Sequence, residues 1–437
     1  MAKPKLALIP AAQGSKLFSV LPSSGVGDFD FSRSGKATRI NSQGLIEEVS
    51  NGQSRLNYPM IDGKVVGCPH HILEPARSNS LTYSEDFSNA SWIKDSTSIV
   101  SNAIISPDGS LNGSLITANG ANIDHTIYQE QSLTPQTYIF STFVKKNTQR
   151  YVHLAINRLN ASTLWVSSVF DLDTLDTADY SNGSGYNDGV SKIENYGNDW
   201  YKISLTAYLP DSTVYLAFIG FAEDMTAPNI SRGRWQFATS DSFYIWGAML
   251  EQGSYPTSYI KTNGSAVTRS AETATGSGDA ATFNGLQGVL MAEIQKSLTS
   301  SLFDLGLYGS SASNQVRIGW QSNNVYATVY DGAIQAQMVY SNTLSDFNKI
   351  SFKYKENDFA LWVNGFEVAT DNSGSTFSSG DLIKINFSAQ DGVAYPFHGK
   401  AKQIQYYDSA LTDSELEQLT SWTSFTDMAE GQLYTIE

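Results

Sequence analysis

Cysteine is almost absent from the chain, with Cys68 alone among 437 residues. A single cysteine cannot close an intrachain disulfide, so the class of small disulfide-stapled secreted domains is excluded. Stability must come from packing or from oligomerisation. No partner motif for nucleophilic catalysis accompanies Cys68, and we expect its thiol to be buried.

Charge is scarce, and positive charge especially so. Charged residues make up 16% of the sequence, and 28 Lys and Arg stand against 43 Asp and Glu, which gives a formal net charge of −15. Such a surface repels phosphate backbones and anionic lipids, so we expect neither nucleic acid nor a membrane as a partner.

Long apolar runs are missing as well. The longest, such as 215–222, match a strand rather than the roughly 20 residues of a membrane-spanning helix. Near the N-terminus, the apolar residues 6–9 are ended by Pro10 and are too short for a signal peptide. We therefore expect synthesis in a cytoplasm.

Aromatic and turn-forming residues are plentiful, with 23 Tyr, 21 Phe and 34 Gly. Apolar and polar residues alternate in stretches bounded by turn residues, which predicts an all-β fold of sandwich or jelly-roll type. These stretches are 137–145, 150–157, 164–172, 200–209, 214–222 and 242–250. Three tryptophans within apolar strands are expected in the core, namely Trp200, Trp246 and Trp362.

The length suggests about three domains, and the pattern divides the chain into four parts. Residues 1–77 have many turn signals and few apolar residues, so we predict an extended anchoring segment that needs a partner surface. Residues 78–267 are the predicted jelly roll. The Ala, Thr, Gly and Ser of 268–284 indicate a linker, and residues 285–437 form a second predicted β-sandwich.

Local signals within 285–437 are specific. Asp331-Gly332 and Asn364-Gly365 each join two strand-like stretches, and both dipeptides favour the type I′ turn of a hairpin. Thr412 followed by Glu415 is a capping box, which predicts a short C-terminal helix.

Catalytic and metal-binding patterns are weak. A glycosidase needs two opposed carboxylates, but the strand motif Glu-x-Asp-x-x-Glu is missing and the adjacent acids suit a solvated surface, so an enzyme is not predicted. The aspartates of Asp171–Asp179 fail the EF-hand spacing at Leu175 and indicate a polar turn, with calcium as the alternative. The adjacent His70 and His71 point apart in an extended chain. No metal ligands and no cofactor are predicted.

Aromatic side chains are the best candidates for a ligand surface, because sugar rings stack on them while polar neighbours bond the hydroxyl groups. In 150–157, alternation places Val152, Leu154 and Ile156 in the core, so the opposite face points outward. The alternative is that this outward face packs against another module or subunit. The candidate glycan-binding residues are Tyr151, His153, Asn157, Arg158 and Trp165.

Three groups of motifs resemble modular appendage proteins of tailed bacteriophages. The N-terminal group, similar to the segment that precedes such modules, comprises 5–10, 29–39, 44–47 and 55–58. The second is similar to the carbohydrate-binding-like jelly roll of the head-spike-fibre type and comprises 73–92, 197–202, 244–254, 258–260 and 266–269. The third resembles a laminin-G or concanavalin-like sandwich and comprises 359–368 and 399–416.

The resemblance implies a non-enzymatic virion protein, a head or tail fibre or spike that attaches to host-surface glycan. It implies docking on other capsid or tail proteins through residues 1–77, and a homotrimer, since phage fibres are usually trimeric. Three alternatives stay open: a structural decoration or connector protein, a glycan depolymerase, and a secreted bacterial adhesin.

Overall fold

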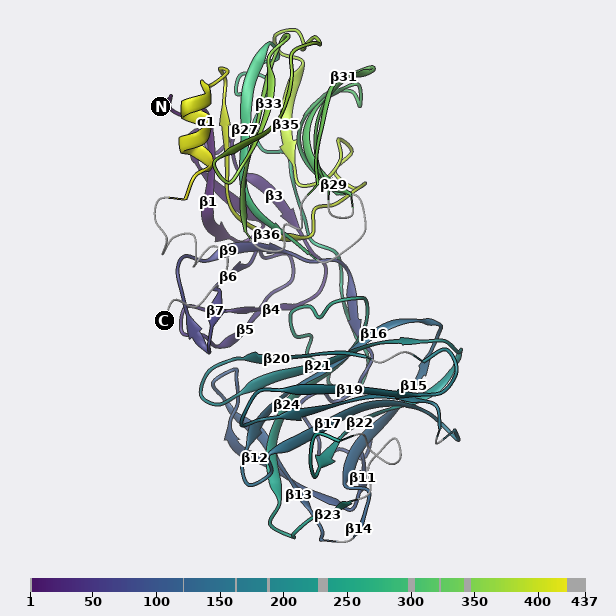
Figure 1. The fold of residues 1–437 in the computed structure, drawn as a ribbon. Helices are drawn as coiled ribbons and strands as arrows, with labels where there is room; N and C mark the ends of the chain where they lie inside the picture. Colours follow the sequence, from purple (N-terminus) through teal and green to yellow (C-terminus); the bar gives the residue numbers. More distant parts are fainter. Residues whose placement is uncertain are drawn as a thin grey trace.

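The computed structural model describes residues 2–120, 122–161, 163–186, 189–226, 235–297, 303–321, 324–341 and 347–422. Within these ranges the chain forms strands and a single short helix, which confirms the predicted all-β class. Figure 1 shows two β-sandwiches, one above the other, with short strands between them. We call these the first sandwich (residues 78–253) and the second sandwich, and we call residues 33–77 and 254–272, which pass between them, the neck.

The first sandwich consists of two six-stranded antiparallel sheets. One has the order β11 (Ile93–Asp95), β15 (Thr126–Leu133), β22 (Thr213–Ala222), β17 (Tyr151–Arg158), β18 (Trp165–Asp171) and β19 (Thr177–Asn182). The other has the order β12 (Thr97–Ile105), β13 (Leu111–Ala118), β24 (Ser242–Gln252), β16 (Gln136–Lys146), β21 (Tyr201–Leu209) and β20 (Val190–Asn195). All six predicted stretches are strands, and both sheets contribute to one buried core.

The second sandwich packs an eleven-stranded sheet on a five-stranded one around a single core. The large sheet runs β26 (Thr273–Thr275), β3 (Phe29–Ser32), β2 (Lys16–Leu21), β1 (Leu6–Gln13), β36 (Gly399–Tyr407), β27 (Gln287–Lys296), β32 (Asn348–Lys355), β33 (Phe359–Val363) and β34 (Phe366–Asp371), with β9 (His70–Leu73) on β36 and β6 (Leu56–Asn57) on β9. The small sheet runs β31 (Ile334–Ser341), β30 (Asn324–Asp331), β29 (Asn314–Gln321), β28 (Phe303–Gly309) and β35 (Leu382–Asn386).

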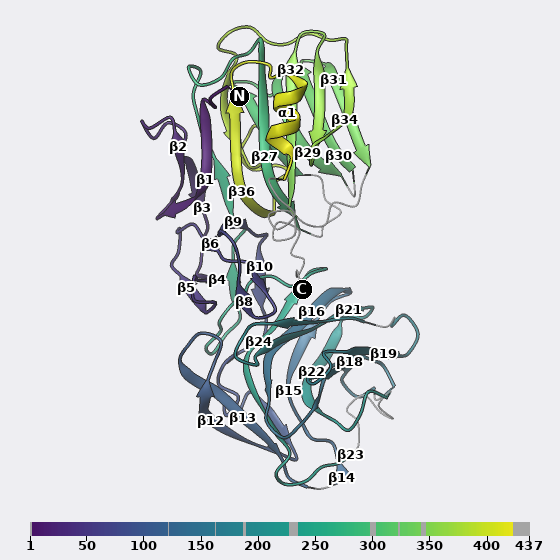
Figure 2. The same cartoon turned by 60° about the vertical axis from the view of Figure 1, so that its left-hand side comes forward.

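The N-terminal strands belong to the second sandwich, which differs from the expected separate anchoring segment. β1 pairs antiparallel with β36, with Leu6 opposite Tyr406, and the two lie side by side in Figure 2. Leu6, Leu8 and Phe29 are fully buried in the core of that sandwich. The predicted need for a partner surface is thus met by a sheet that is distant in sequence. The first sandwich is an insertion in the second.

The predicted linker 268–284 is also built into the fold. β26 extends the large sheet by pairing with β3, and β25 (Val267–Arg269) pairs with β10 (Arg77–Asn79). Glu272, Ala274 and Ser277 are fully buried. Small residues suggest a flexible tether, but here they let the chain pass through tightly packed surroundings. The remaining short pairs are β4 (Ala37–Ile40) with β5 (Ile46–Val49), β7 (Met60–Ile61) with β8 (Lys64–Val65), and β14 (Asn122–Ile123) with β23 (Trp235–Gln236).

The two hairpins and the helix predicted in the second sandwich are present, but one of the two turns differs from the predicted type. Asn364 and Gly365 both have positive φ, as a type I′ turn requires, whereas at the other hairpin only Gly332 does and the register shifts beside it. The helix α1 (Asp413–Thr420) begins at Thr412 with both capping-box bonds present. It packs Leu416 on the outer face of the large sheet.

Two further expectations have clear outcomes. Trp200, Trp246 and Trp362 are buried, as predicted. The thiol of Cys68 is exposed, which corrects the expected burial; the preceding Gly67 has a positive φ and turns the chain at the surface. No helix of the described chain has both the length and the apolar character to cross a membrane.

Candidate functional site

Three of the predicted glycan-binding residues share one face of the sheet at β17, as expected, but that face is not exposed to solvent. Asn157 pairs with Trp165 across β17 and β18, so these side chains share a face with His153. Their exposed fractions are 0% for His153, 4% for Asn157 and 5% for Trp165. This corrects their expected exposure. Burial also lowers the pKa of His153 to about 4, so its ring is neutral near pH 7.

The neighbouring strand β22 is apolar on the same face. Its residues Leu216 and Phe218 share this face with Ala155 and form a second, small apolar cluster. The alternation of residues on β17 identifies its two faces, but it does not show whether one face or both faces are buried. The sequence signal for burial of both faces was the unbroken apolar run 215–222 in β22, because such a run is typical of a strand covered on both sides.

The other two candidates lie at opposite ends of β17. The ring of Tyr151 packs under the guanidinium of Arg150 at 4.9 Å, and Arg158 Nη1 lies 3.1 Å from Asp211 Oδ2. Along the strand the two are seven positions apart, which corresponds to about 23 Å. The five predicted residues therefore do not converge on one open site.

The aspartate run 171–179 forms a turn held by its own side chains. Asp171 accepts hydrogen bonds from Arg150 Nε at 2.8 Å and from the Asp173 amide at 2.9 Å. Burial opposes ionisation, but these bonds lower its pKa to about 2. Among the described residues, no group of three or more His, Cys, Asp or Glu is arranged to hold a metal ion.

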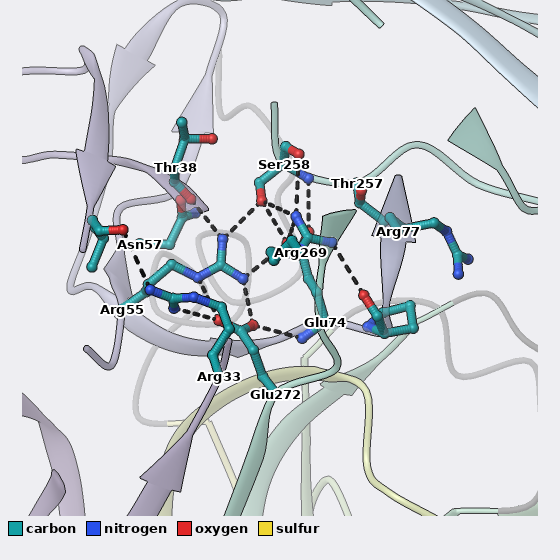
Figure 3. A network of polar contacts seen from close by, with 12 residues as sticks. Arg33, Thr38, Arg55, Asn57, Glu74, Arg77, Thr257, Ser258, Arg269 and Glu272 are labelled. Carbon is teal, nitrogen blue, oxygen red and sulfur yellow. Dashed lines mark hydrogen bonds and ion pairs between the residues drawn. The ribbon is translucent and has the colours of Figure 1, made fainter. Parts of the chain in front are cut away.

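A buried charge network occupies the neck (Figure 3). Its members Arg33, Arg55, Arg269, Glu74 and Glu272 each expose 6% of their surface or less. Arg55 reaches both carboxylates, because Nε donates to Glu272 Oε1 at 2.8 Å and Nη2 to Glu74 Oε2 at 2.9 Å. Arg33 Nη1 donates to Glu272 Oε1 at 2.8 Å, and Arg269 Nη1 lies 2.9 Å from Glu74 Oε2. The network joins both passages of the chain through the neck.

Electrostatics fix the charge states of this network. Burial alone would raise the pKa of Glu74, but the charges of Arg269 and Arg55 and the hydrogen bond from Ser258 lower it well below its ordinary value. Glu74 also accepts a hydrogen bond from the Ser258 amide at 2.8 Å. A carboxylate so held is ionised at physiological pH and cannot donate a proton, so the network is structural.

A cavity of about 630 Å³ lies beside the network, between the neck and the two sandwiches. Five aromatic residues line it, and we call the two buried ones the floor and the three half-buried ones the rim. Phe143 and Tyr259 form the floor, with exposed fractions of 1% and 4%. The rings of Tyr58, Tyr196 and Tyr255 are half-buried and form the rim. Phe143 holds Tyr196 edge-on at 4.9 Å, which fixes one side of the rim.

Polar groups complete the lining and come from all three parts of the protein. They include Asn57 in the neck, Asn195 at the end of β20 and Gln295 in β27. One wall is made by a close approach of two turns. A Cβ atom on Gly63 would lie 2.4 Å from Asn195 Oδ1 and 2.7 Å from Gly197 Cα, so only glycine fits there.

Sequence reasoning did not identify this cavity, because its lining runs from Thr38 to Lys400 and no local pattern marks it. The motifs 197–202 and 258–260 do contribute lining residues, among them Lys202 and Tyr259. A second hollow, of about 590 Å³, is lined by a single charged side chain, Arg77, and one aromatic ring. The larger cavity is therefore the candidate site.

Comparisons with known proteins give distant structural likenesses. No family model and no curated protein matches the chain. The CBM40 module of the Ruminococcus gnavus IT-sialidase, bound to α2,3-sialyllactose, is 19% identical, with 32% of this chain and 84% of that chain covered and a TM-score of 0.28. Domain 4 of the arabinanase AbnA from Geobacillus stearothermophilus, in complex with arabinotriose, is 15% identical, with 35% and 73% covered and a TM-score of 0.25.

A third solved structure, the Trypanosoma rangeli sialidase in complex with sialic acid, is 13% identical, with 74% of this chain and 62% of that chain covered. Its TM-score is 0.28. TM-scores this low carry no inference about ligand or activity.

Proposed function

We propose that this chain is a non-enzymatic virion protein of a tailed bacteriophage, a head or tail fibre or spike, which binds host-surface glycan in the cavity between its sandwiches. The observation that carries the glycan-binding part is the lining of that cavity. The phage part rests on the resemblance of the motifs in 73–92, 197–202 and 244–254 to appendage proteins.

The cavity offers what a sugar requires. Its volume of about 630 Å³ lies within the range of small-molecule sites, roughly 300–1,000 Å³. Tyr58, Tyr196 and Tyr255 line it, and the C–H faces of a pyranose stack on rings of this kind. The Arg77 guanidinium already lies over one face of the Tyr255 ring, 5.4 Å from its centroid. The side chain of Asn195 lines the same space, and its amide nitrogen can donate to a sugar hydroxyl, whereas its Oδ1 already accepts from the Gly197 amide. The Asn57 amide is already bonded to Ile40 and His70.

Binding without cleavage fits the carboxylates that line the cavity. Glycoside hydrolysis needs one protonated and one ionised carboxyl on opposite sides of the bond. The pKa of Glu74 is held low by arginines. Burial would raise the pKa of Glu194, but nearby lysines lower it. Two of the three lining acids, Glu74 and Glu194, therefore carry no proton to donate near neutral pH.

Weak sugar contacts become useful when several copies bind together. We propose a homotrimer docked on other virion proteins through residues 1–77, as the resemblance implies. Sedimentation of the purified protein should then give three times the chain mass of 47.7 kDa. A purified monomer, together with full adsorption by virions that lack the protein, would refute the attachment role.

The glycan-binding proposal is tested by Tyr255→Ala, which removes a ring from the rim, and by Tyr208→Ala as the matched control. Tyr208 is 48% exposed and does not line the cavity. On an array of host-surface glycans, the first variant should lose binding by about tenfold or more, as expected when a stacking ring is removed, and the second should bind normally. Equal binding by both variants, or release of reducing ends from the glycan, would contradict the proposal.

A further inference from the structure

The second hollow, of about 590 Å³, is a neighbour of the cavity. Two short segments of the neck, 74–77 and 254–257, contribute residues to both linings. In the first segment Glu74 lines the cavity and Ala76 lines the hollow. In the second, Tyr255 lines the cavity, and Ser254, directly before it in the chain, lines the hollow. Because residues this close in the chain belong to both linings, the two spaces are adjacent.

A contact between Arg77 and Tyr255 joins the two linings. Arg77 lines the hollow, and its guanidinium lies over the ring of Tyr255, which lines the cavity. Figure 3 shows the Arg77 side chain pointing away from the buried charge network. Its Nε lies 3.5 Å from Glu251 Oε2, so the charge of Arg77 already has a partner. The pair of Arg77 and Tyr255 therefore forms the border between the hollow and the cavity.

Hydroxyl and amide groups provide most of the polar lining of the hollow. Ser132, Gln136, Thr137 and Gln252 line it, at the ends of β15, β16 and β24. Their side chains make no hydrogen bond to any other residue in the part of the chain that the structure describes. Hydroxyl and primary amide groups each donate and accept hydrogen bonds, as sugar hydroxyl groups do. The hollow thus offers four side chains that can exchange bound water for a sugar.

We infer that the hollow is a second subsite for the same glycan, so that the ligand is a linear oligosaccharide that runs from the cavity past Arg77 and Tyr255 into the hollow. The inference rests on the proposed glycan-binding function and adds the length of its ligand. Each space alone has the volume of a small-molecule site, so the two together take a chain of several sugars. The units in the hollow are uncharged, because Arg77 is the one charged residue of its described lining and already pairs with Glu251.

The test varies the length of the ligand. The glycan array carries each backbone, galactan, arabinan and dextran among them, as a series from the disaccharide to the octasaccharide, and titration calorimetry then measures the series that binds. We expect the octasaccharide to bind at least tenfold more tightly than the disaccharide, because the second subsite is filled within a complex that has already formed. One octasaccharide should bind per chain. The gain with length should not fall as salt rises, since uncharged units produce it.

A variant in the hollow locates the gain. Gln252→Ala removes an amide group from the hollow and leaves the cavity unchanged, because Gln252 does not line the cavity. It should weaken binding of the octasaccharide about fivefold, as expected for the loss of one hydrogen bond, and leave binding of the disaccharide unchanged. The matched control is Gln337→Ala, because Gln337 is also an exposed strand glutamine and lines neither space.

The outcomes separate this inference from the proposed function. If the disaccharide binds as tightly as the octasaccharide, or if Gln252→Ala binds the octasaccharide as the unaltered protein does, the second subsite is overturned and glycan binding in the cavity stands. Two octasaccharides bound per chain would mean two separate sites and would also overturn it. If no glycan on the array binds, the proposed function itself fails. Because the dependence on length is measured on the unaltered protein, a variant that does not fold leaves the test decisive.

Discussion

Glu272 provides the most demanding test of how the neck holds the two sandwiches together. Its carboxylate is fully buried and accepts hydrogen bonds from Arg33, from Arg55 twice, and from the amide of Glu74. Glu272→Gln keeps the shape of the side chain but removes its charge. The amide nitrogen of the new glutamine is a hydrogen-bond donor and would face the N–H donors of the arginines. Three buried arginines would face a single carboxylate.

The size of the effect follows from burial. Removing one partner of a buried ion pair leaves an uncompensated charge in a poorly solvated site, which costs about 3–5 kcal/mol. We expect Glu272→Gln to lose about that much free energy of unfolding. The matched control is Glu48→Gln. Glu48 pairs with Lys36 at 2.6 Å, but their side chains are 44% and 68% exposed, and such surface pairs contribute under about 1 kcal/mol.

Urea unfolding followed by tryptophan fluorescence and by hydrogen exchange measures both variants. The network bonds both passages of the chain through the neck, so its loss should also separate the unfolding of the two sandwiches into distinct steps. If Glu272→Gln and Glu48→Gln shift the free energy of unfolding equally, by under about 1 kcal/mol, the network does not stabilise the neck and our reasoning is wrong.

Three further predictions concern the same architecture. Folding lowers the pKa of Glu74, so the stability from its ionised form is full above an unfolded pKa of about 4.3 and is lost as the pH falls; acid unfolding should depend less on pH in Glu74→Gln. Leu8→Ala should cost about 2–5 kcal/mol, measured as faster hydrogen exchange in the second sandwich. Gly63→Ala should cost about 1–3 kcal/mol in urea unfolding, because a positive φ of 74° and a contact with Asn195 both oppose a Cβ atom.

The sequence predicted those features that depend on neighbours in the chain. Alternation located the strands of the first sandwich, and the capping box located α1, because backbone geometry and local hydrogen bonds decide both. The turn predicted at Asn364-Gly365 is confirmed for the same reason, since both residues have the positive φ that it requires. Asp331-Gly332 gave a hairpin of another turn type, since the bulge in its register depends on packing across the sheet.

Contacts between segments that are far apart in the chain could not be predicted from the sequence. The composition of 268–284 suggests a tether, but a charge on Glu272 is compatible with burial only where Arg33 and Arg55 come from far away to meet it. Likewise, the second face of β17 carries an apolar cluster that Ala155 forms with Leu216 and Phe218 of β22, a strand distant in sequence. Such contacts are set by topology, which a single sequence leaves undetermined.

The insertion of one sandwich into the other constrains how attachment and binding can be combined. Residues 1–77 contribute β1, β2 and β3 to the large sheet, and residues 38–74 line part of the cavity. The proposed docking segment is thus neither a free tail nor separate from the proposed glycan site. Its remaining outward apolar side chains lie along the β1–β2 ribbon and the turn after it, namely Ile9, Val20 and Val26, with exposed fractions of 39%, 50% and 38%. β1 pairs with β36, and Gly399 and Lys400 of β36 line the cavity. A virion partner that docks on this ribbon would therefore contact the same sheet that carries part of the cavity wall.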